Sequence, residues 1–164
     1  MALPVEAVLA AVYGIFALAP RRGVFAQLAD DPAEVTRDAA TQSDSINLVL
    51  FLLAGIGALV VIGLMVAWLL RSRRTTEAPS ASFSPAWWVV TALGFAAVVV
   101  ALALHANSDP GPIAVGYVFM GIGALLIAGA SAWAMPVVRK AGRQAAQAAA
   151  DAAASSATSS PSPS

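Results

Sequence analysis

Residues 46–70 read INLVLFLLAGIGALVVIGLMVAWLL, an uncharged stretch of 25 residues that ends directly at Arg71, Arg73 and Arg74. At about 1.5 Å of rise per residue, such a helix is longer than a hydrocarbon core of about 30 Å. A buried helix of a soluble protein would be shorter and would show a polar face. The stretch therefore predicts a transmembrane helix that is followed by a basic stop at the membrane surface.

Two further uncharged stretches have the same character. Residues 86–104 number 19, which is just long enough to span a bilayer. Residues 113–138 follow the turn-forming sequence DPGP at 109–112 and end at Arg139 and Lys140. The sequence thus predicts an all-α fold, a small polytopic membrane helix bundle with transmembrane helices at 46–70, 86–104 and 113–138.

The composition of the whole chain agrees with a membrane protein. Hydrophobic residues make up 59% and charged residues 11% of the chain, whereas soluble domains are about 25% charged. Nine basic and nine acidic residues give a net charge of zero, so we expect no nucleic-acid partner. The chain has no cysteine, which excludes disulfides, thiolate nucleophiles and thiolate metal sites.

Residues 1–22 form a separate apolar segment. Pro4 stands where a helix can start, Glu6 follows, and Arg21 and Arg22 close the segment. A glutamate in the region where a signal peptide carries Lys or Arg disfavours a cleaved signal. Two interpretations stay open: a fourth transmembrane helix, with Arg21 and Arg22 on the outer side, or an interfacial helix that lies against the bundle.

The remaining segments are short. Residues 23–45 are acidic and predict an extracytoplasmic connector, with a helix start at Asp31 because Pro follows at the first helical position. Residues 139–164 begin with basic residues and become rich in Ala, Ser and Pro. That composition predicts a short helical extension followed by a disordered tail.

Basic residues and tryptophans predict the orientation. Lys and Arg gather at the cytoplasmic ends of spans, and they occur in 71–85 and 139–164 but not in the turn 105–112. We therefore expect the C-terminus in the cytoplasm, or inside the particle if the chain belongs to a virion envelope. The expected interfacial anchors are Trp68, Trp87, Trp88 and Trp133, and the residues expected to set orientation or contact lipid headgroups are Arg71, Arg73, Arg74, Arg139, Lys140 and Arg143.

A short internal similarity links the first and third spans. Residues 55–63 read GIGALVVIG and residues 121–129 read GIGALLIAG, with six identities in nine. The match indicates either a duplication or the chance similarity of helices built from the same few residue types. In both cases small residues let helices approach closely in lipid. The candidate helix-packing residues are Gly55, Gly57, Gly63, Gly121, Gly123 and Gly129.

Candidate chemistry is sparse. No Asp, Glu, Lys, Arg or His lies within the three predicted spans, although proton relays and ion-coupled carriers need such a residue. His105 is the single histidine and has no second ligand for a haem. Asn47, Thr91 and Ser131 form no set of nucleophile, base and oxyanion donor. We therefore expect no enzyme, no catalytic, cofactor-binding or metal-binding residue, no cofactor and no small-molecule substrate.

These observations favour a non-enzymatic, structural integral membrane protein that acts as a bilayer-embedded component of a larger assembly. That assembly is either a membrane complex, with this chain as an accessory subunit, or a virion envelope. The expected partners are membrane lipid and other membrane protein subunits or further copies of the chain. The alternative is a small oligomeric pore or holin-like channel, for which Asn47, Thr91 and Ser131 are the polar residues that the spans supply. A redox or enzyme subunit would require a bound chromophore.

Overall fold

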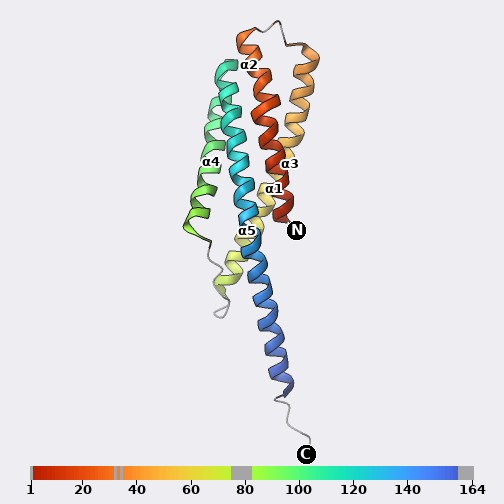
Figure 1. Cartoon of the computed structure of the whole chain (residues 1–164), viewed down its shortest axis with the longest axis vertical. Coiled ribbons are helices and arrows are strands. Elements are labelled where there is room, and N and C mark those ends of the chain that lie inside the picture. Colours follow the sequence, from red (N-terminus) through yellow and green to blue (C-terminus); the bar gives the residue numbers. More distant parts are fainter. Residues whose placement is uncertain (1, 32, 34, 75–82, 159–164) are drawn as a thin grey trace, which may run out of the picture.

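The described part of the chain is an all-α bundle (Figure 1), as the sequence predicts. A computed structural model describes residues 2–31, 33, 35–74 and 83–158, with the backbone alone at 68, 69, 71–74 and 156–158. The elements are α1 (Ala2–Phe16), a π-helical turn η1 (Ala17–Arg21), α2 (Arg22–Asp30), α3 (Arg37–Arg74), α4 (Pro85–His105) and α5 (Pro110–Thr158).

The N-terminal segment runs along the bundle axis beside the other helices (Figure 1). α1 packs against both α3 and α5, so it is a member of the bundle and does not lie across its end. Four helical stretches of the described chain are long and apolar enough to cross a membrane: Ala2–Asp30, Arg37–Ala67, Pro85–His105 and Pro110–Ser155. α1 begins at one end of the bundle, and α5 leaves the bundle at the same end, which we call the terminal end.

The π-helical turn η1 is caused by Pro20. A proline inside a helix lacks an N–H and its ring collides with the carbonyl four residues earlier, which here belongs to Phe16. The helix widens locally, and the Arg22 N–H bonds to the Ala17 carbonyl five residues before it. The extra residue turns Arg21 toward the bundle, where it is buried.

The turn between α2 and α3 differs from the prediction. The helix start predicted at Asp31 is wrong, because α3 begins at Arg37. Thr36 Oγ1 accepts a hydrogen bond from the Ala39 N–H at 3.3 Å, and the Asp31 carboxylate instead accepts from the Ala33 N–H at 2.9 Å. Asp31 therefore shapes a chain reversal, and Thr36 takes the capping position.

The last two helices have conventional starts. Ser84 Oγ accepts from the Trp87 N–H at 3.3 Å, and Pro85 occupies the first turn of α4. Asp109 accepts from the Gly111 N–H at 3.0 Å in the turn before α5. α5 then continues past the bundle to Thr158 (Figure 1), further than the short extension that the composition predicts.

The interior of the bundle is built mainly from small residues. α5 lies centrally and packs against α4, α1 and α2. Alanines supply most of the buried apolar side chains, and the large ones among them are Tyr13, Trp87, Tyr117 and Met120. Small side chains let the backbones come close, which gives the van der Waals contact that holds helices together in lipid.

Candidate functional site

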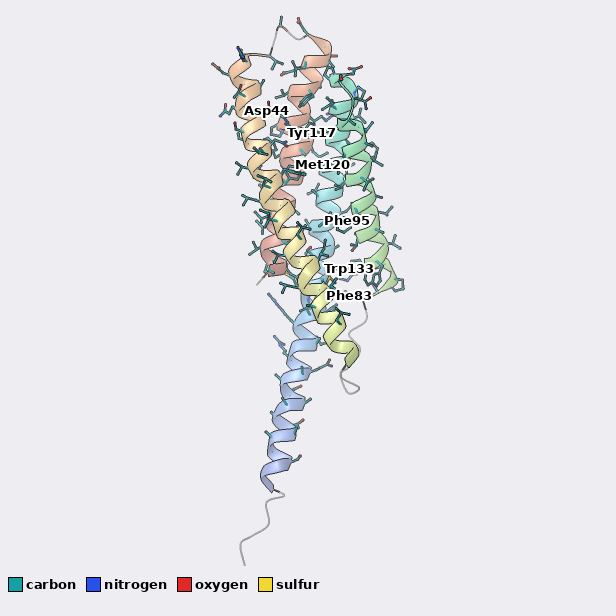
Figure 2. The ribbon with its side chains drawn as sticks, turned by 180° about the vertical axis from the view of Figure 1, so that it is seen from behind. Asp44, Phe83, Phe95, Tyr117, Met120 and Trp133 are labelled. Atoms are coloured by element: carbon teal, nitrogen blue, oxygen red, sulfur yellow. The ribbon has the colours of Figure 1, made fainter. Side chains whose placement is uncertain are left out.

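Two charged residues are buried among the described residues, Glu6 in α1 and Arg21 in η1. Arg21 Nε donates to Tyr117 Oη at 3.0 Å, and Arg21 Nη1 donates to Ser43 Oγ at 2.9 Å. Its Nη2 forms an ion pair with Asp44. Asp44 and Tyr117 lie near the end of the bundle opposite the terminal end (Figure 2). Arg21 therefore bonds simultaneously to α3 and α5.

Aromatic rings complete this Arg21 cluster, which consists of Arg21, Phe25, Ser43, Asp44, His105 and Tyr117. The guanidinium lies over the rings of Phe25 and Tyr117, at 4.7 and 5.2 Å from their centroids. Tyr117 in turn meets the edge of His105 at 4.4 Å between centroids. The cluster takes side chains from η1, α2, α3, α4 and α5, so it links these helical elements at this end of the bundle.

The His105 ring packs against the backbone of α4 and against Gly116 of α5. Its Nδ1 lies 2.7 Å from the Ala101 carbonyl, and Nε2 is buried without a hydrogen-bond partner. A Cβ at Gly116 would lie 2.8 Å from Nδ1, so the glycine makes room for the ring. Within the described residues, no three His, Cys, Asp or Glu side chains come together to hold a metal ion.

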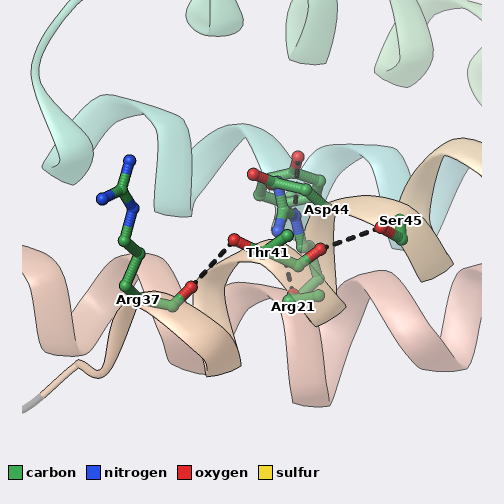
Figure 3. Close-up of polar contacts among 7 residues, drawn as sticks. Arg21, Arg37, Thr41, Asp44 and Ser45 are labelled. Carbon is green, nitrogen blue, oxygen red and sulfur yellow. Dashed lines mark hydrogen bonds and ion pairs between the residues drawn. The ribbon is translucent and has the colours of Figure 1, made fainter.

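The start of α3 beside this cluster is stabilised within the helix. Thr41 Oγ1 donates to the Arg37 carbonyl at 2.9 Å, and Ser45 Oγ donates to the Thr41 carbonyl at 3.0 Å (Figure 3). These bonds run back one turn along the helix, as is usual for Ser and Thr. They keep both hydroxyls occupied locally, while Ser43 and Asp44 turn toward Arg21.

The other buried charged residue is Glu6, one turn into α1. The residue is 2% exposed, and its Oε2 is buried without a hydrogen-bond partner. The oxygen rests against Gly57 of α3, where a Cβ would collide with it. Beside it is a cavity of about 60 Å³ whose lining includes Glu6, Thr91 and Ser131 among apolar side chains.

A larger hollow opens at the terminal end of the bundle. It measures about 530 Å³ and is lined by the first residues of α1, by α3 and by α5, with Arg139 as its charged member. Leu3, Val61 and Met65 line both this hollow and the cavity beside Glu6. The two spaces are thus separated by a single layer of side chains.

The six predicted helix-packing glycines divide into two sets. Gly121 would place a Cβ 2.8 Å from the Gly14 carbonyl oxygen, Gly123 would place one 2.8 Å from the Gly94 carbonyl oxygen, and Gly57 faces Glu6. Nothing lies within 4 Å of a Cβ at the other three, Gly55, Gly63 and Gly129. Gly14, Gly94 and Gly116 also meet neighbouring helices closely, although they belong to no repeated motif that would have singled them out.

The four tryptophans predicted as interfacial anchors differ in their surroundings. Trp87 is buried, and its Nε1 donates to the Ala130 carbonyl at 2.8 Å. Trp88 and Trp133 are exposed, and Trp133 lies toward the terminal end (Figure 2). The side chain of Trp68 lies outside the described residues.

The predicted basic residues lie on two helices. Arg71, Arg73 and Arg74 form the last turn of α3, with side chains outside the described residues. Arg139, Lys140 and Arg143 are exposed on α5 where it leaves the bundle.

Comparison of the chain with protein families, with curated proteins and with solved structures finds no match.

Proposed function

We propose that the chain is a non-enzymatic structural membrane protein, a bilayer-embedded component of a larger assembly. The assembly is either a membrane complex, in which the chain is an accessory subunit, or a virion envelope. The observation that carries the proposal is the outward face of α3. None of the residues in the most apolar part of α3 is buried, and within the chain α3 packs mainly on α1.

The outward face of α3 suits a neighbouring helix. Gly55, Leu59, Gly63 and Ala67 follow one another at intervals of four, so they share one side of the helix. All four are exposed, and a Cβ at either glycine would meet nothing within 4 Å. Small residues spaced by four let a second helix approach closely. The face thus supports contact with another subunit or with a second copy of the chain.

The polar residues favour this proposal over the alternative of a pore between chains. Such a pore needs polar side chains on outward helix faces. Ser131 is buried, Thr91 donates to the Trp87 carbonyl at 2.8 Å, and both line the cavity beside Glu6. Asn47 Oδ1 is buried as well. Of the three side chains that the pore hypothesis requires, Ser131 is thus buried and Asn47 and Thr91 are half-buried, so none lies on a fully exposed helix face.

The absence of native cysteine allows a direct test with single-cysteine variants. Leu59→Cys places a thiol between the two outward glycines, and Val99→Cys places one on the lipid-facing side of α4 as the control. The two sites are similarly exposed within the chain, at 70% and 64%. In native membranes we expect Leu59→Cys to give one cross-linked product that mass spectrometry identifies. The cross-link is a disulfide to a neighbouring thiol under oxidation, or a bond to a neighbouring nucleophile through a bifunctional thiol-reactive reagent. The Val99→Cys control should give no such product.

Purification of the wild-type chain in mild detergent supplies the second measurement. A stoichiometric partner, or a defined homo-oligomer that Leu59→Cys cross-links, agrees with the proposal. A monomer without partners, together with equal cross-linking at both cysteine positions, would contradict it.

A further inference from the structure

Beyond the structural role, we propose that Glu6 is a proton-binding site within the membrane part of the bundle. We further infer that it exchanges its proton with the compartment at the terminal end. The ligand is the proton itself, taken up by the carboxyl group. The inference stands on the burial of the side chain, on the groups around it and on the hollow that leads toward it.

Among the described residues, no counter-charge borders the Glu6 carboxyl group. The cavity beside Glu6 is lined from α3, α4 and α5, and none of these lining residues is charged or titratable. The hydroxyl groups of this lining belong to Thr91 and Ser131, and the Thr91 hydroxyl already donates to the Trp87 carbonyl. On α1 itself, Tyr13 lies two turns away and packs against Phe51. Arg139 lines the adjoining hollow and does not line the cavity.

This environment suits the neutral acid. An ionised carboxylate in apolar surroundings is very costly unless it is paired and hydrogen-bonded, whereas a protonated carboxyl is a small polar group. Glu6 Oε2 is buried and has no hydrogen-bond partner. Intramembrane ionisable residues are costly and are characteristic of proton and ion pathways. The Glu6 carboxyl group therefore binds a proton, because its ionised form would need a positively charged partner.

Gly57 leaves room for the carboxyl group of Glu6. Any side chain at this position would collide with Glu6 Oε2. Gly55, two residues earlier on the same helix, has open space around it. The pair of glycines thus provides a variant that disturbs the site and a matched variant that does not.

Access is asymmetric along the bundle. Toward the terminal end, Leu3, Val61 and Met65 alone are shared between the cavity and the larger hollow at Arg139. Toward the other end, Tyr13 and Met120 are buried in a packed cluster with Ala101 and Ala124. A proton reaches Glu6 from the terminal end by displacement of a few flexible side chains, while the opposite route is filled.

The test uses the full chain in phospholipid vesicles and dicyclohexylcarbodiimide, an apolar reagent that attacks protonated carboxyl groups. At neutral pH we expect an adduct on Glu6, located by peptide mass spectrometry, and none on the exposed acids Asp38 and Asp109. Glu6→Gln removes the adduct. The infrared carbonyl band of the protonated acid should be absent in Glu6→Gln, shifted in Gly57→Ala and unchanged in Gly55→Ala.

Sidedness is measured in vesicles whose orientation is reported by labelling of Gln147→Cys on α5. Alkaline buffer on the terminal side should abolish the adduct, and alkaline buffer on the other side should leave it. The proposal is overturned if wild-type Glu6 forms no adduct and shows no protonated-acid band. It is also overturned if sodium chloride, but not choline chloride, protects Glu6 at fixed pH, because a metal cation would then be the ligand. The wild-type measurements decide even if Glu6→Gln does not fold.

Discussion

Arg21 donates hydrogen bonds from three guanidinium nitrogens, and its partners differ in their exposure to solvent. Tyr117 is 4% exposed, whereas the Asp44 side chain is 66% exposed. A buried hydrogen bond to a charged group contributes about 1.5–3 kcal/mol, whereas an exposed ion pair contributes about 0–1 kcal/mol. We expect Tyr117→Phe to lower the free energy of unfolding by the larger amount and Asp44→Asn by the smaller. Thermal unfolding of both variants in one detergent measures the order, and the reverse order would contradict this account.

At the same scale, the sequence identifies which side chains are polar but not where they lie. In the sequence, Glu6 disfavours a signal peptide, and Arg21 is a basic residue that a fourth span would place on the outer side. The Arg21–Tyr117 bond joins residues 96 positions apart. Hydropathy and local spacing do not encode which helices become neighbours, so neither buried site could be predicted. The signal in the sequence is that a fourth span over the N-terminal segment would contain Glu6 as an ionisable residue.

Among the helices, close packing is specific to individual glycines. A Cβ at Gly123 would lie 2.8 Å from the Gly94 carbonyl oxygen, which is backbone and cannot move aside, while Gly129 faces open space. We expect Gly123→Leu to lower the free energy of unfolding by about 1–3 kcal/mol through overpacking. Gly129→Leu should leave it unchanged or raise it by up to about 1 kcal/mol, because leucine favours helix over glycine. Thermal unfolding of both variants in one detergent measures the difference. Equal free energies of unfolding would show that residue 123 is no more tightly packed than residue 129.

The helices themselves were largely predictable, whereas their ends were not. The uncharged stretches mark the apolar middle of α3, α4 and α5 because the bilayer requires about 20 apolar residues. α3 begins at Arg37, nine residues before the predicted span. Thr36 caps this polar first turn, and hydropathy does not mark a helix that lies outside the apolar stretch. The repeat at 55–63 and 121–129 predicts small residues but not their contacts, because Gly55 and Gly121 match in sequence and differ in packing.

For the whole molecule, the up-and-down arrangement places the start of α1 and the exit of α5 at one end. Exposed basic residues follow the last span there, which predicts that this end faces the cytoplasm. We expect Asn107→Cys, in the turn before α5, to react with a membrane-impermeant maleimide in intact cells. Gln147→Cys should react only after lysis. The opposite pattern would reverse the topology and would assign the Arg21 cluster to the cytoplasmic side.

The last part of α5 extends beyond the bundle as a single helical arm. The helix continues to Thr158, twenty residues beyond residue 138, which is about 30 Å at 1.5 Å per residue. Pro136 lies at the base of this arm, where the helix lacks a backbone hydrogen bond and bends most readily. A small change in tilt at that point is therefore magnified into a displacement of several ångströms at the tip. The described end of α5, at Thr158, therefore lies well clear of the bundle, and a tilt at Pro136 moves it further than any residue inside the bundle.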